Sequence, residues 1–366
     1  MNRTEACIAL NMLPTMGPVR LRKLLEVFET PERILSAKRS ELRTVHGIGE
    51  EVAEQITKWE SAIDLSAELQ RVRDFGCEVI TAESPNYPRQ LREIHAPPIV
   101  LYVWGELTER DQHAFGVIGS RRTSHYGAES AKKLSYQLAY SGLTIVSGLA
   151  RGIDTAAHQG ALAAKGRTIA VIGSGLTNLY PPENAALAEK IRDGHGAVVS
   201  EFSMAVEPDR QTFPMRNRII SGWSIGILVV ECGVNSGALI TASQAIEQGR
   251  SVYAIPGHIN APTAIGSNRL IQQGAKLVMD ASDILDDLQI LLPEKQKLPD
   301  AAARPLPELN DDERRVYDAI RPTETPIDDI ANASELPSAT VSSVLLRLEL
   351  KHLVKQLPGK YFVKLS

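Results

Sequence analysis

The sequence predicts an α/β protein whose central part is a doubly wound, mostly parallel sheet. Short apolar runs such as 114–118, 143–146 and 168–172 recur across residues 81–292, and a helical stretch follows each run. The runs are apolar at successive positions rather than at alternate ones. Strands of this kind are covered by helices on both faces, as in parallel sheets. The order of strands and helices therefore predicts an extended Rossmann-like domain.

The composition is that of a globular protein rather than of a disordered or fibrous chain. The 366 residues are 43% apolar and 23% charged, and this length favours two or three domains. No apolar run is long enough to span a bilayer. The first residues lack the basic region and unbroken apolar core of a signal peptide. We therefore expect a cytoplasmic protein that does not contact a membrane.

Cysteine content and charge narrow the possibilities further. Cys7, Cys77 and Cys232 are odd in number and far apart, which argues against a disulfide framework or a zinc knuckle and fits a reducing compartment. The net charge is −4 and the isoelectric point is about 6.1. A globally basic nucleic-acid-binding surface is excluded, so any DNA site must be a local groove.

Residues 1–80 are expected to form a small helical domain of the SAM-like or helix-hairpin-helix type. Apolar residues recur at helical spacing around Leu24 and again around Ile56, with glycines and prolines between them. Gly47-Ile48-Gly49 resembles the hairpin of such a module, whose glycines let backbone N–H groups reach a phosphate. A DNA contact and a simple packing turn both fit this pattern.

The central domain is expected to span residues 81–292. Its first strand, 99–103, follows two prolines and is interpreted as an edge strand. The other expected strands are 114–118, 143–146, 168–172, 197–199, 225–230, 251–255 and 276–279. The expected helices between them pass through Leu134 and Leu138 and then cover 153–164, 185–191, 216–221, 237–247 and 268–273.

The C-terminal part is expected to be a separate winged-helix domain. Residues 293–310 are rich in proline, alanine and charge and are interpreted as a linker. Residues 311–366 show three helical stretches and then a hairpin around Pro358-Gly359. The third helix offers a single arginine, and the first two are acidic, which is unlike a major-groove reader. We expect a protein-contact or auxiliary role.

The loops that follow the strands contain the candidate binding residues. Ligands of open parallel sheets bind at the carboxyl ends of the strands, next to helix N-termini. Arg121, Arg151, Arg216 and Arg218 fall on loops expected to converge there, and arginine pairs well with phosphate. Phe213 is expected either to stack on a base or to anchor its loop in the core. Arg122, Lys132 and Lys133 are interpreted as a solvated helix face.

No catalytic constellation stands out. The sequence contains no phosphate-binding loop ending in Gly-Lys-Ser/Thr, no G-x-S-x-G elbow and no H-E-x-x-H. The histidines are not clustered at ligand spacing, and His158 is interpreted as structural. Asp154 is expected to brace its own turn. We therefore expect a protein that is not an enzyme and that requires no cofactor and no metal.

Several long motifs occur together in register and resemble the DprA/Smf family of DNA-processing proteins. The resemblance is close over residues 80–280. It rests on Gly119-Ser120-Arg121, on Ser147 to Asp154 (SGLARGID), on Phe213 to Ser221 (FPMRNRIIS), on Glu231-Cys232-Gly233 through Ser236 to Ala242 (SGALITA), on Pro256-Gly257 and on Gly266-Ser267-Asn268.

The resemblance implies a function for the chain. Family members bind single-stranded DNA in a positive pocket of an extended Rossmann fold and form homodimers through this domain. They protect incoming single strands and load RecA recombinase onto them during natural transformation. Transferred to this sequence, the expected DNA-binding residues are Gly119, Ser120, Arg121, Ser147, Gly148, Arg151, Gly152, Phe213, Arg216, Asn217 and Arg218. Replacing either Arg121 or Arg216 with alanine is expected to weaken binding without unfolding the protein.

Two alternatives belong to other classes. The fold also resembles nucleoside-monophosphate phosphoribohydrolases, with Glu231 ahead of a glycine-containing helix start. Their P-G-G-x-G-T-x-x-E motif is incomplete here, because Ile240 or Thr241 stands where the catalytic glutamate belongs. The other alternative is a transcription regulator that reads DNA with the winged helix. Binding that disappears when residues 311–366 are removed would favour it.

Overall fold

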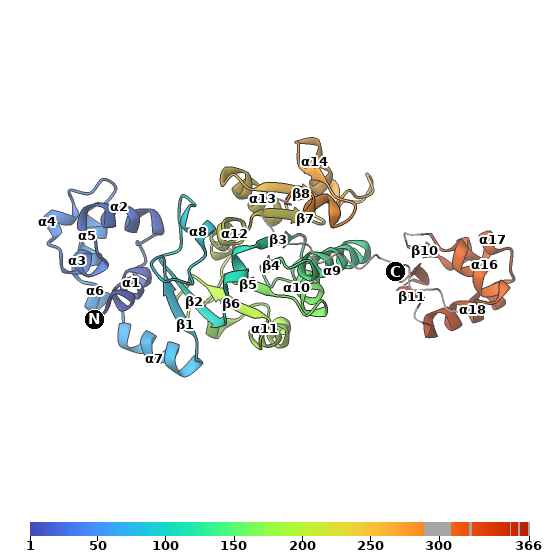
Figure 1. The fold of residues 1–366 in the computed structure, drawn as a ribbon, viewed down its shortest axis with the longest axis horizontal. Coiled ribbons are helices and arrows are strands. Elements are labelled where there is room, and N and C mark those ends of the chain that lie inside the picture. The colour runs from blue at the N-terminus through green and yellow to red at the C-terminus, as the bar shows by residue number, and fades with distance from the viewer. Residues whose placement is uncertain (289–308, 322–323, 352, 358, 365–366) are drawn as a thin grey trace. The chain divides into compact units, whose positions relative to one another are not determined.

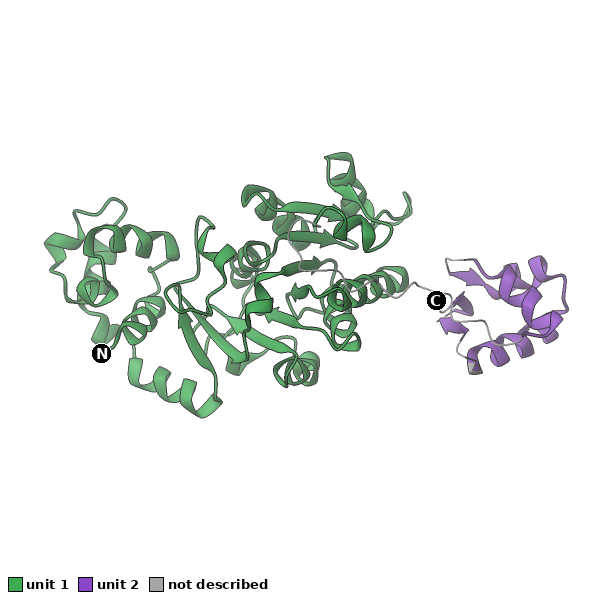
Figure 2. Ribbon diagram, in the orientation of Figure 1, with its two compact units in different colours: residues 1–296 green, residues 297–366 purple. Residues whose placement is uncertain are grey.

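The computed structural model describes residues 1–288, 309–321, 324–351, 353–357 and 359–364. The chain divides into two compact units, residues 1–296 and 297–366 (Figure 2). The expected linker, 293–310, lies almost entirely outside the described residues. The domain limits proposed from the sequence therefore remain predictions.

The first unit is built on one large sheet, which confirms the predicted α/β class (Figure 1). Its strand order is β1-β2-β6-β5-β4-β3-β7-β8-β9. The strands from β6 to β9 in this order are parallel, and β1 and β2 are antiparallel additions. The strands are β1 (Glu78–Thr81), β2 (Val100–Gly105), β3 (Ala114–Ile118), β4 (Thr144–Ser147), β5 (Thr168–Val171), β6 (Gly196–Ser200), β7 (Gly226–Val229), β8 (Ser251–Ala254) and β9 (Lys276–Leu277).

One strand prediction was wrong. The strand expected at 99–103 is β2, and it is not at the edge, because it pairs with β6 on one side and with β1 on the other. The edge strand is β1, which the sequence pattern did not reveal. Its four residues, between Gly76 at the end of α7 (Leu65–Phe75) and the turn at Ser84-Pro85, are too few to show a clear strand pattern.

Helices cover both faces of the sheet, as the apolar strands predict. Alternate residues of β5 belong to different cores. Ala170 shares one with Ile191 of α11, whereas Ile169 shares the other with Ile219 of α12. The helices in this part are α8 (Arg89–Arg92), α9 (His125–Tyr140), α10 (Ile153–Ala163), α11 (Ala185–Arg192), α12 (Thr212–Trp223), α13 (Gly237–Glu247), α14 (Ile265–Gln272) and α15 (Ser282–Leu285).

The chain order creates a switch point beside β3. From β3 the chain moves through β4 and β5 to β6, and it then returns to place β7 on the other side of β3. Because crossovers between parallel strands are right-handed, the helices that follow β3 and β7 lie on opposite faces. The carboxyl ends of these two neighbours therefore leave a crevice, which is where open α/β sheets bind ligands.

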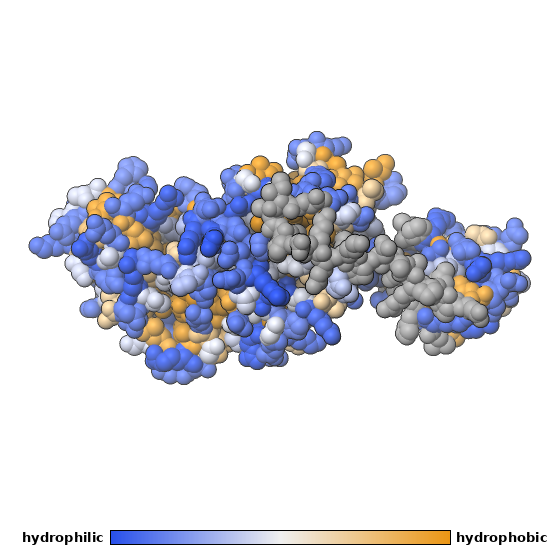
Figure 3. Space-filling model, in the orientation of Figure 1, coloured by the Kyte–Doolittle hydropathy of each residue, from blue (hydrophilic) through white to orange (hydrophobic). Residues whose placement is uncertain are grey.

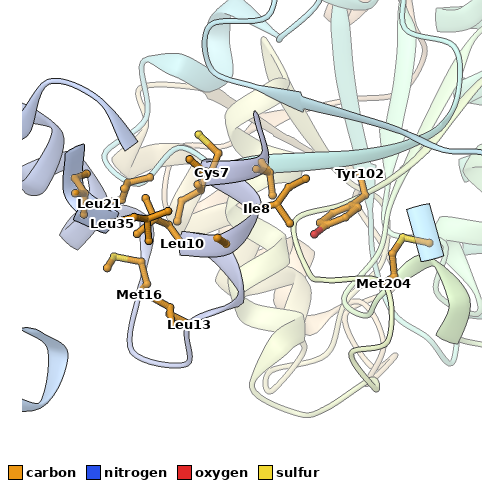
Figure 4. Close-up of a cluster of buried hydrophobic side chains, with 14 of the residues drawn as sticks. Cys7, Ile8, Leu10, Leu13, Met16, Leu21, Leu35, Tyr102 and Met204 are labelled. Carbon is orange, nitrogen blue, oxygen red and sulfur yellow. The ribbon is translucent and has the colours of Figure 1, made fainter. Parts of the chain in front are cut away.

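The N-terminal helices pack against the same sheet. Ile8 and Leu10 of α1 belong to one core with Tyr102 of β2 and with Met204 (Figure 4). The carboxylate of Glu68 also accepts a hydrogen bond from the backbone N of Met204 at 2.8 Å. The helices of this N-terminal part are α1 (Arg3–Met12), α2 (Pro18–Phe28), α3 (Pro31–Ser36), α4 (Arg39–Leu42), α5 (Glu50–Thr57), α6 (Trp59–Ala62) and α7.

Aromatic contacts close the side of the sheet where α7 and α11 lie. On the face drawn in Figure 3, hydrophilic side chains predominate, and hydrophobic ones gather between these two helices. Phe75 of α7 lies 5.2 Å from Trp104 of β2 between ring centroids, and the Arg192 guanidinium lies 5.1 Å from the Trp104 ring. These contacts join the N-terminal helices to the sheet.

The second unit has the predicted winged-helix order. A three-stranded sheet, in the order β10-β12-β11, completes a core that includes Val316, Val344 and Phe362. The elements are α16 (Asp311–Ala319), β10 (Thr325–Pro326), α17 (Ile327–Ser334), α18 (Ser338–Leu350), β11 (Val354–Leu357) and β12 (Tyr361–Lys364). In the described ranges of both units, every helix is too short or too polar to cross a membrane.

Candidate nucleic-acid interface

A pocket of about 860 Å³ opens at the switch point. Its walls come from the loop after β3, the first turns of α12, and the loop between β7 and α13. The charged side chains that line it are four arginines and one carboxylate: Arg121, Arg122, Arg210, Arg216 and Asp154. A chain with a net charge of −4 thus has a locally positive pocket.

Two glycines let the loops of the pocket interlock. Gly152 has φ +78°, and a Cβ there would lie 2.8 Å from the Arg121 carbonyl oxygen. A Cβ at Gly119 would lie 2.8 Å from the Glu231 carbonyl oxygen. The backbone N of Ser120 donates to that same Glu231 oxygen at 2.7 Å. Any larger residue at either glycine would separate these loops.

Arg121 and Phe213 form the exposed wall of the pocket. The exposed Arg121 guanidinium lies 4.6 Å from the centroid of the Phe213 ring. This distance is that of a cation–π contact. The backbone at Gly173 packs directly against the Phe213 ring, because a Cβ added at Gly173 would lie only 2.9 Å from that ring. This close packing holds Phe213 in place.

Arg216 also lines the pocket but is buried, with 4% of its surface exposed. Its Nη1 donates to the carbonyl oxygen of Gly148 at 2.6 Å and to that of Val171. Burial lowers the pKa of Arg216 to about 10, although the negative charge of Asp154 opposes this shift. Arg216 therefore ties the loop after β4 to the end of β5.

Asp154 supports the same loop, as expected. Its carboxylate accepts hydrogen bonds from the backbone N of Gly148 at 3.1 Å and of Ala150 at 3.4 Å. Burial raises the pKa of Asp154, and the positive charge of Arg216 acts in the opposite direction. The buried arginine and carboxylate stabilise one turn from two sides.

The sequence placed Arg216 and Arg218 both in a helix predicted for 216–221 and on a loop at the pocket, and the loop placement was wrong. Arg216 and Arg218 lie inside α12, which begins at Thr212 rather than at 216. Arg218 is 12% exposed and pairs with the buried Glu201. It does not line the pocket. Pro214 is the reason for the difference, because proline reads as a turn but is tolerated in the first turn of a helix.

The predicted site residues thus separate into two groups. Six line the pocket: Gly119, Ser120, Arg121, Phe213, Arg216 and Asn217. Five do not: Ser147, Gly148, Arg151, Gly152 and Arg218. Ser147 is fully buried and donates from Oγ to the Val117 carbonyl oxygen at 2.6 Å, so it braces the sheet. Arg151 is exposed nearby and pairs with Glu183.

Sequence reasoning missed part of the lining. Arg122 lies in the loop before α9, not on a helix face, and it lines the pocket together with Arg210. Val234 and Ile240 add apolar surface and are 43% and 44% exposed. The loop that contains Arg210 has no periodic pattern, so its only signal was its position three residues before Phe213.

Glu231, which precedes the helix start that resembles the phosphoribohydrolase motif, accepts hydrogen bonds at both carboxylate oxygens. One of its oxygens accepts from Thr123 Oγ1 at 2.6 Å and from Ser124 N at 2.8 Å, and the other accepts from Thr263. Burial on its own raises the pKa of this carboxyl, but the three hydrogen bonds outweigh burial and lower it. Glu231 therefore joins three segments of the chain. Within the described part of the chain, no three or more His, Cys, Asp or Glu side chains gather where they could hold a metal ion.

Family models of known proteins match each of the three parts of the chain. The family model for DNA recombination-mediator protein A matches residues 78–289. Models for the DprA winged helix domain and for a SAM-like helix-hairpin-helix tandem match residues 300–360 and 8–58. Protein Smf of Synechocystis is 34% identical over 96% of both chains. Protein Smf of Escherichia coli is 42% identical over 77% of this chain and 76% of its own.

Solved structures agree with these matches. The structure of DNA processing protein A from Streptococcus pneumoniae is 36% identical, covers 78% of this chain and 99% of its own, and has a TM-score of 0.69. The Helicobacter pylori protein, whose structure is described as revealing a single-stranded-DNA-binding mode, is 25% identical and covers 60% of this chain and 99% of its own, with a TM-score of 0.53. With a family model over most of the first unit and a full-length relative at 34% identity, the chain belongs to the DprA/Smf family of DNA-processing proteins.

Proposed function

We propose that this protein binds single-stranded DNA in the pocket between β3 and β7. We further propose that it acts as a recombination mediator, protecting incoming strands and loading RecA onto them during natural transformation. The observation that carries the proposal is the contact of Arg121 with Phe213 at the wall of a pocket lined by four arginines and one carboxylate. The Helicobacter pylori relative, described as a single-stranded-DNA-binding protein, supports it.

The pocket has the two chemical features that sequence-independent binding of single strands requires. Cations neutralise the phosphates, and an aromatic face stacks with bases. Arg121, Arg122 and Arg210 are exposed and are available for phosphates. Phe213 provides the ring, and the exposed Val234 and Ile240 provide apolar surface for further bases.

We assign different roles to the expected site residues. Gly119, Ser120, Arg121, Phe213 and Asn217 line the open pocket and would contact DNA. The buried or bracing residues Ser147, Gly148, Gly152, Arg216 and Arg218 would shape it.

The test compares DNA binding with and without the second unit. Anisotropy of a labelled poly-dT oligonucleotide should report salt-sensitive binding by the full chain, and a chain lacking residues 311–366 should retain most of it. Binding that vanishes with those residues, while the remainder stays folded, would move the site to the winged helix. Such a result would favour the transcription-regulator alternative.

RecA loading has its own measurement. We expect the protein to increase RecA-catalysed ATP hydrolysis on single strands that are already coated with single-strand-binding protein. The Arg121→Ala variant should lose this stimulation together with its DNA binding. A protein that binds single strands tightly and leaves RecA unchanged would be a strand protector and not a mediator.

We propose that the protein is a cytoplasmic homodimer formed through the sheet domain. Strand β9 ends the sheet, and Leu277 and the following Met279 are 41% and 80% exposed. Among the described residues no strand pairs with the outer side of β9, and apolar side chains at such an edge favour association with a second copy. Sedimentation should give a dimer, and Met279→Glu should shift it to the monomer.

We also propose that the protein is not a phosphoribohydrolase. Ile240 or Thr241 stands where the catalytic glutamate of those enzymes belongs, and both carboxylate oxygens of the nearby Glu231 are engaged in holding the loops together. No free base should be released from a panel of nucleoside monophosphates. Release of a free base would support the phosphoribohydrolase alternative.

A further inference from the structure

A row of aromatic rings and arginines continues beyond the pocket. Arg121 lies over Phe213, and the Phe213 ring is 6.0 Å from the Tyr180 ring between centroids, at 53° between planes. The Arg151 guanidinium in turn lies 5.8 Å from the centroid of the Tyr180 ring. Cation and ring therefore occur twice in succession, and only the first pair lines the pocket.

Arg151 is paired with an anion of the protein itself. Its guanidinium donates to the carboxylate of Glu183, and the two side chains are 51% and 50% exposed. An exposed ion pair contributes little net stability, because water and salt screen it. A phosphate that arrives beside Tyr180 can therefore compete for Arg151.

The segment carrying Tyr180 and Glu183 is fixed to the loop that carries Arg151. The buried Asn184 donates from Nδ2 to the Leu149 carbonyl oxygen at 2.7 Å and to Thr155 Oγ1 at 2.9 Å. Leu149 is fully buried with φ +56°, a backbone region that non-glycine residues rarely occupy. Asn184 thus fixes the position of Tyr180 relative to Arg151.

We propose that the single strand continues out of the pocket past Phe213 and across Tyr180, where a DNA phosphate replaces Glu183 as the partner of Arg151. This inference rests on the proposed function, because it extends the same DNA path by one step. Alternating cations and rings are the arrangement expected along a single-strand groove. Glu183 then occupies the place of the phosphate in the free protein and weakens binding of long strands.

The path is tested with oligo-dT of increasing length, measured by anisotropy. The shortest strands fill only the pocket, and longer ones reach Tyr180. Tyr180→Leu should weaken binding of the longer strands about tenfold, the typical loss of one stacked base, and leave the shortest strands unchanged. Tyr180→Phe keeps the ring and should bind like the wild type at every length.

The displacement of Glu183 has a matched charge control. Glu183→Gln should strengthen binding of the longer strands about twofold to fivefold, as expected for loss of an exposed ion pair. The shortest strands, which do not reach Arg151, should bind this variant like the wild type. Glu189→Gln makes the same charge change at an exposed position on the neighbouring helix α11 and should bind like the wild type at every length.

The proposal requires both results. It is overturned if Glu183→Gln behaves like Glu189→Gln, or if Tyr180→Leu binds long strands like the wild type. Glu183 is exposed, so this substitution leaves the fold intact and keeps the test valid even if Tyr180→Leu unfolds. If Arg121→Ala still weakens binding at every length, the pocket stands and only the extended path is wrong. If Arg121→Ala has no effect either, the proposed function itself fails.

Discussion

Arg121 and Arg216 line the same pocket and come from motifs that look equally suited to DNA, but their surroundings differ. Arg121 is exposed and covers the face of Phe213. Arg216 is 4% exposed, and its guanidinium donates to the carbonyl oxygens of Gly148 and Val171. The exposed arginine is free to change partners when a phosphate arrives, whereas the buried one already has its partners. Residues of one motif can therefore either contact the ligand or build the pocket, and burial separates the two roles.

The largest effect is expected at Arg216, whose burial contradicts the expectation from the sequence that alanine there would leave the fold unaffected. Arg216→Ala would leave Asp154 buried without its nearby cation and two carbonyl oxygens without their donor, so we expect a loss of about 3–5 kcal/mol in the free energy of unfolding. Denaturant unfolding followed by circular dichroism measures this loss. The same substitution at the exposed Arg121 is the control and should change stability by less than about 0.5 kcal/mol. Equal stabilities for the two variants would contradict the distinction.

Phe213 should show the next largest effect, on binding. Phe213→Leu removes the aromatic face and should weaken poly-dT binding by about 1–3 kcal/mol, the usual contribution of one stacked base. Phe213→Tyr keeps the face and should bind normally. A Phe213→Leu variant that loses stability but not affinity would show that the ring only anchors its helix.

The buried His158, near Arg216, predicts that the stability of the protein depends on pH. Burial, helped by the positive charge of Arg216, lowers the pKa of His158 to about 3. The unfolded chain has a histidine pKa of about 6.5, so it binds a proton before the folded protein does. The stability contributed by neutral His158 is complete above pH 6.5 and decreases as the pH falls towards 3.

This dependence can be measured by comparing two proteins. Between pH 6.5 and pH 5.5 the wild type should lose about 1 kcal/mol more unfolding free energy than His158→Gln. Parallel pH curves for the two proteins would show that His158 is protonated, or accessible to water, in the folded state.

Arg122 should give the smallest effect. It is exposed and lines the pocket, so Arg122→Ala should weaken binding about twofold to fivefold, in the range of an exposed charge pair. Lys133→Ala removes the same charge from the exposed surface of α9 and should bind like the wild type. Equal weakening by both would mean that only the overall charge of this surface matters.

The sequence predicted the central fold well because buried parallel strands are apolar on both faces, and this property is visible in runs such as 168–172. It did not predict β1, whose four residues pair only with β2. It began the helix at 216 rather than at Thr212, because Pro214 resembles a turn. The burial of Arg216 and the position of Arg210 depend on how distant loops meet, and no local pattern encodes that. The motif residues were therefore found, but their division between contact and support required the fold.

The most direct test of the account is the salt dependence of poly-dT binding by the wild type and by Arg121→Ala. We expect salt-sensitive binding by the wild type. The variant should bind about tenfold to a hundredfold more weakly, as expected for the loss of one charge-assisted contact, and its salt slope should be smaller by about 0.7. Equal binding by both proteins at every salt concentration, or no binding by the wild type at low salt, would contradict the assignment of the pocket as the DNA site.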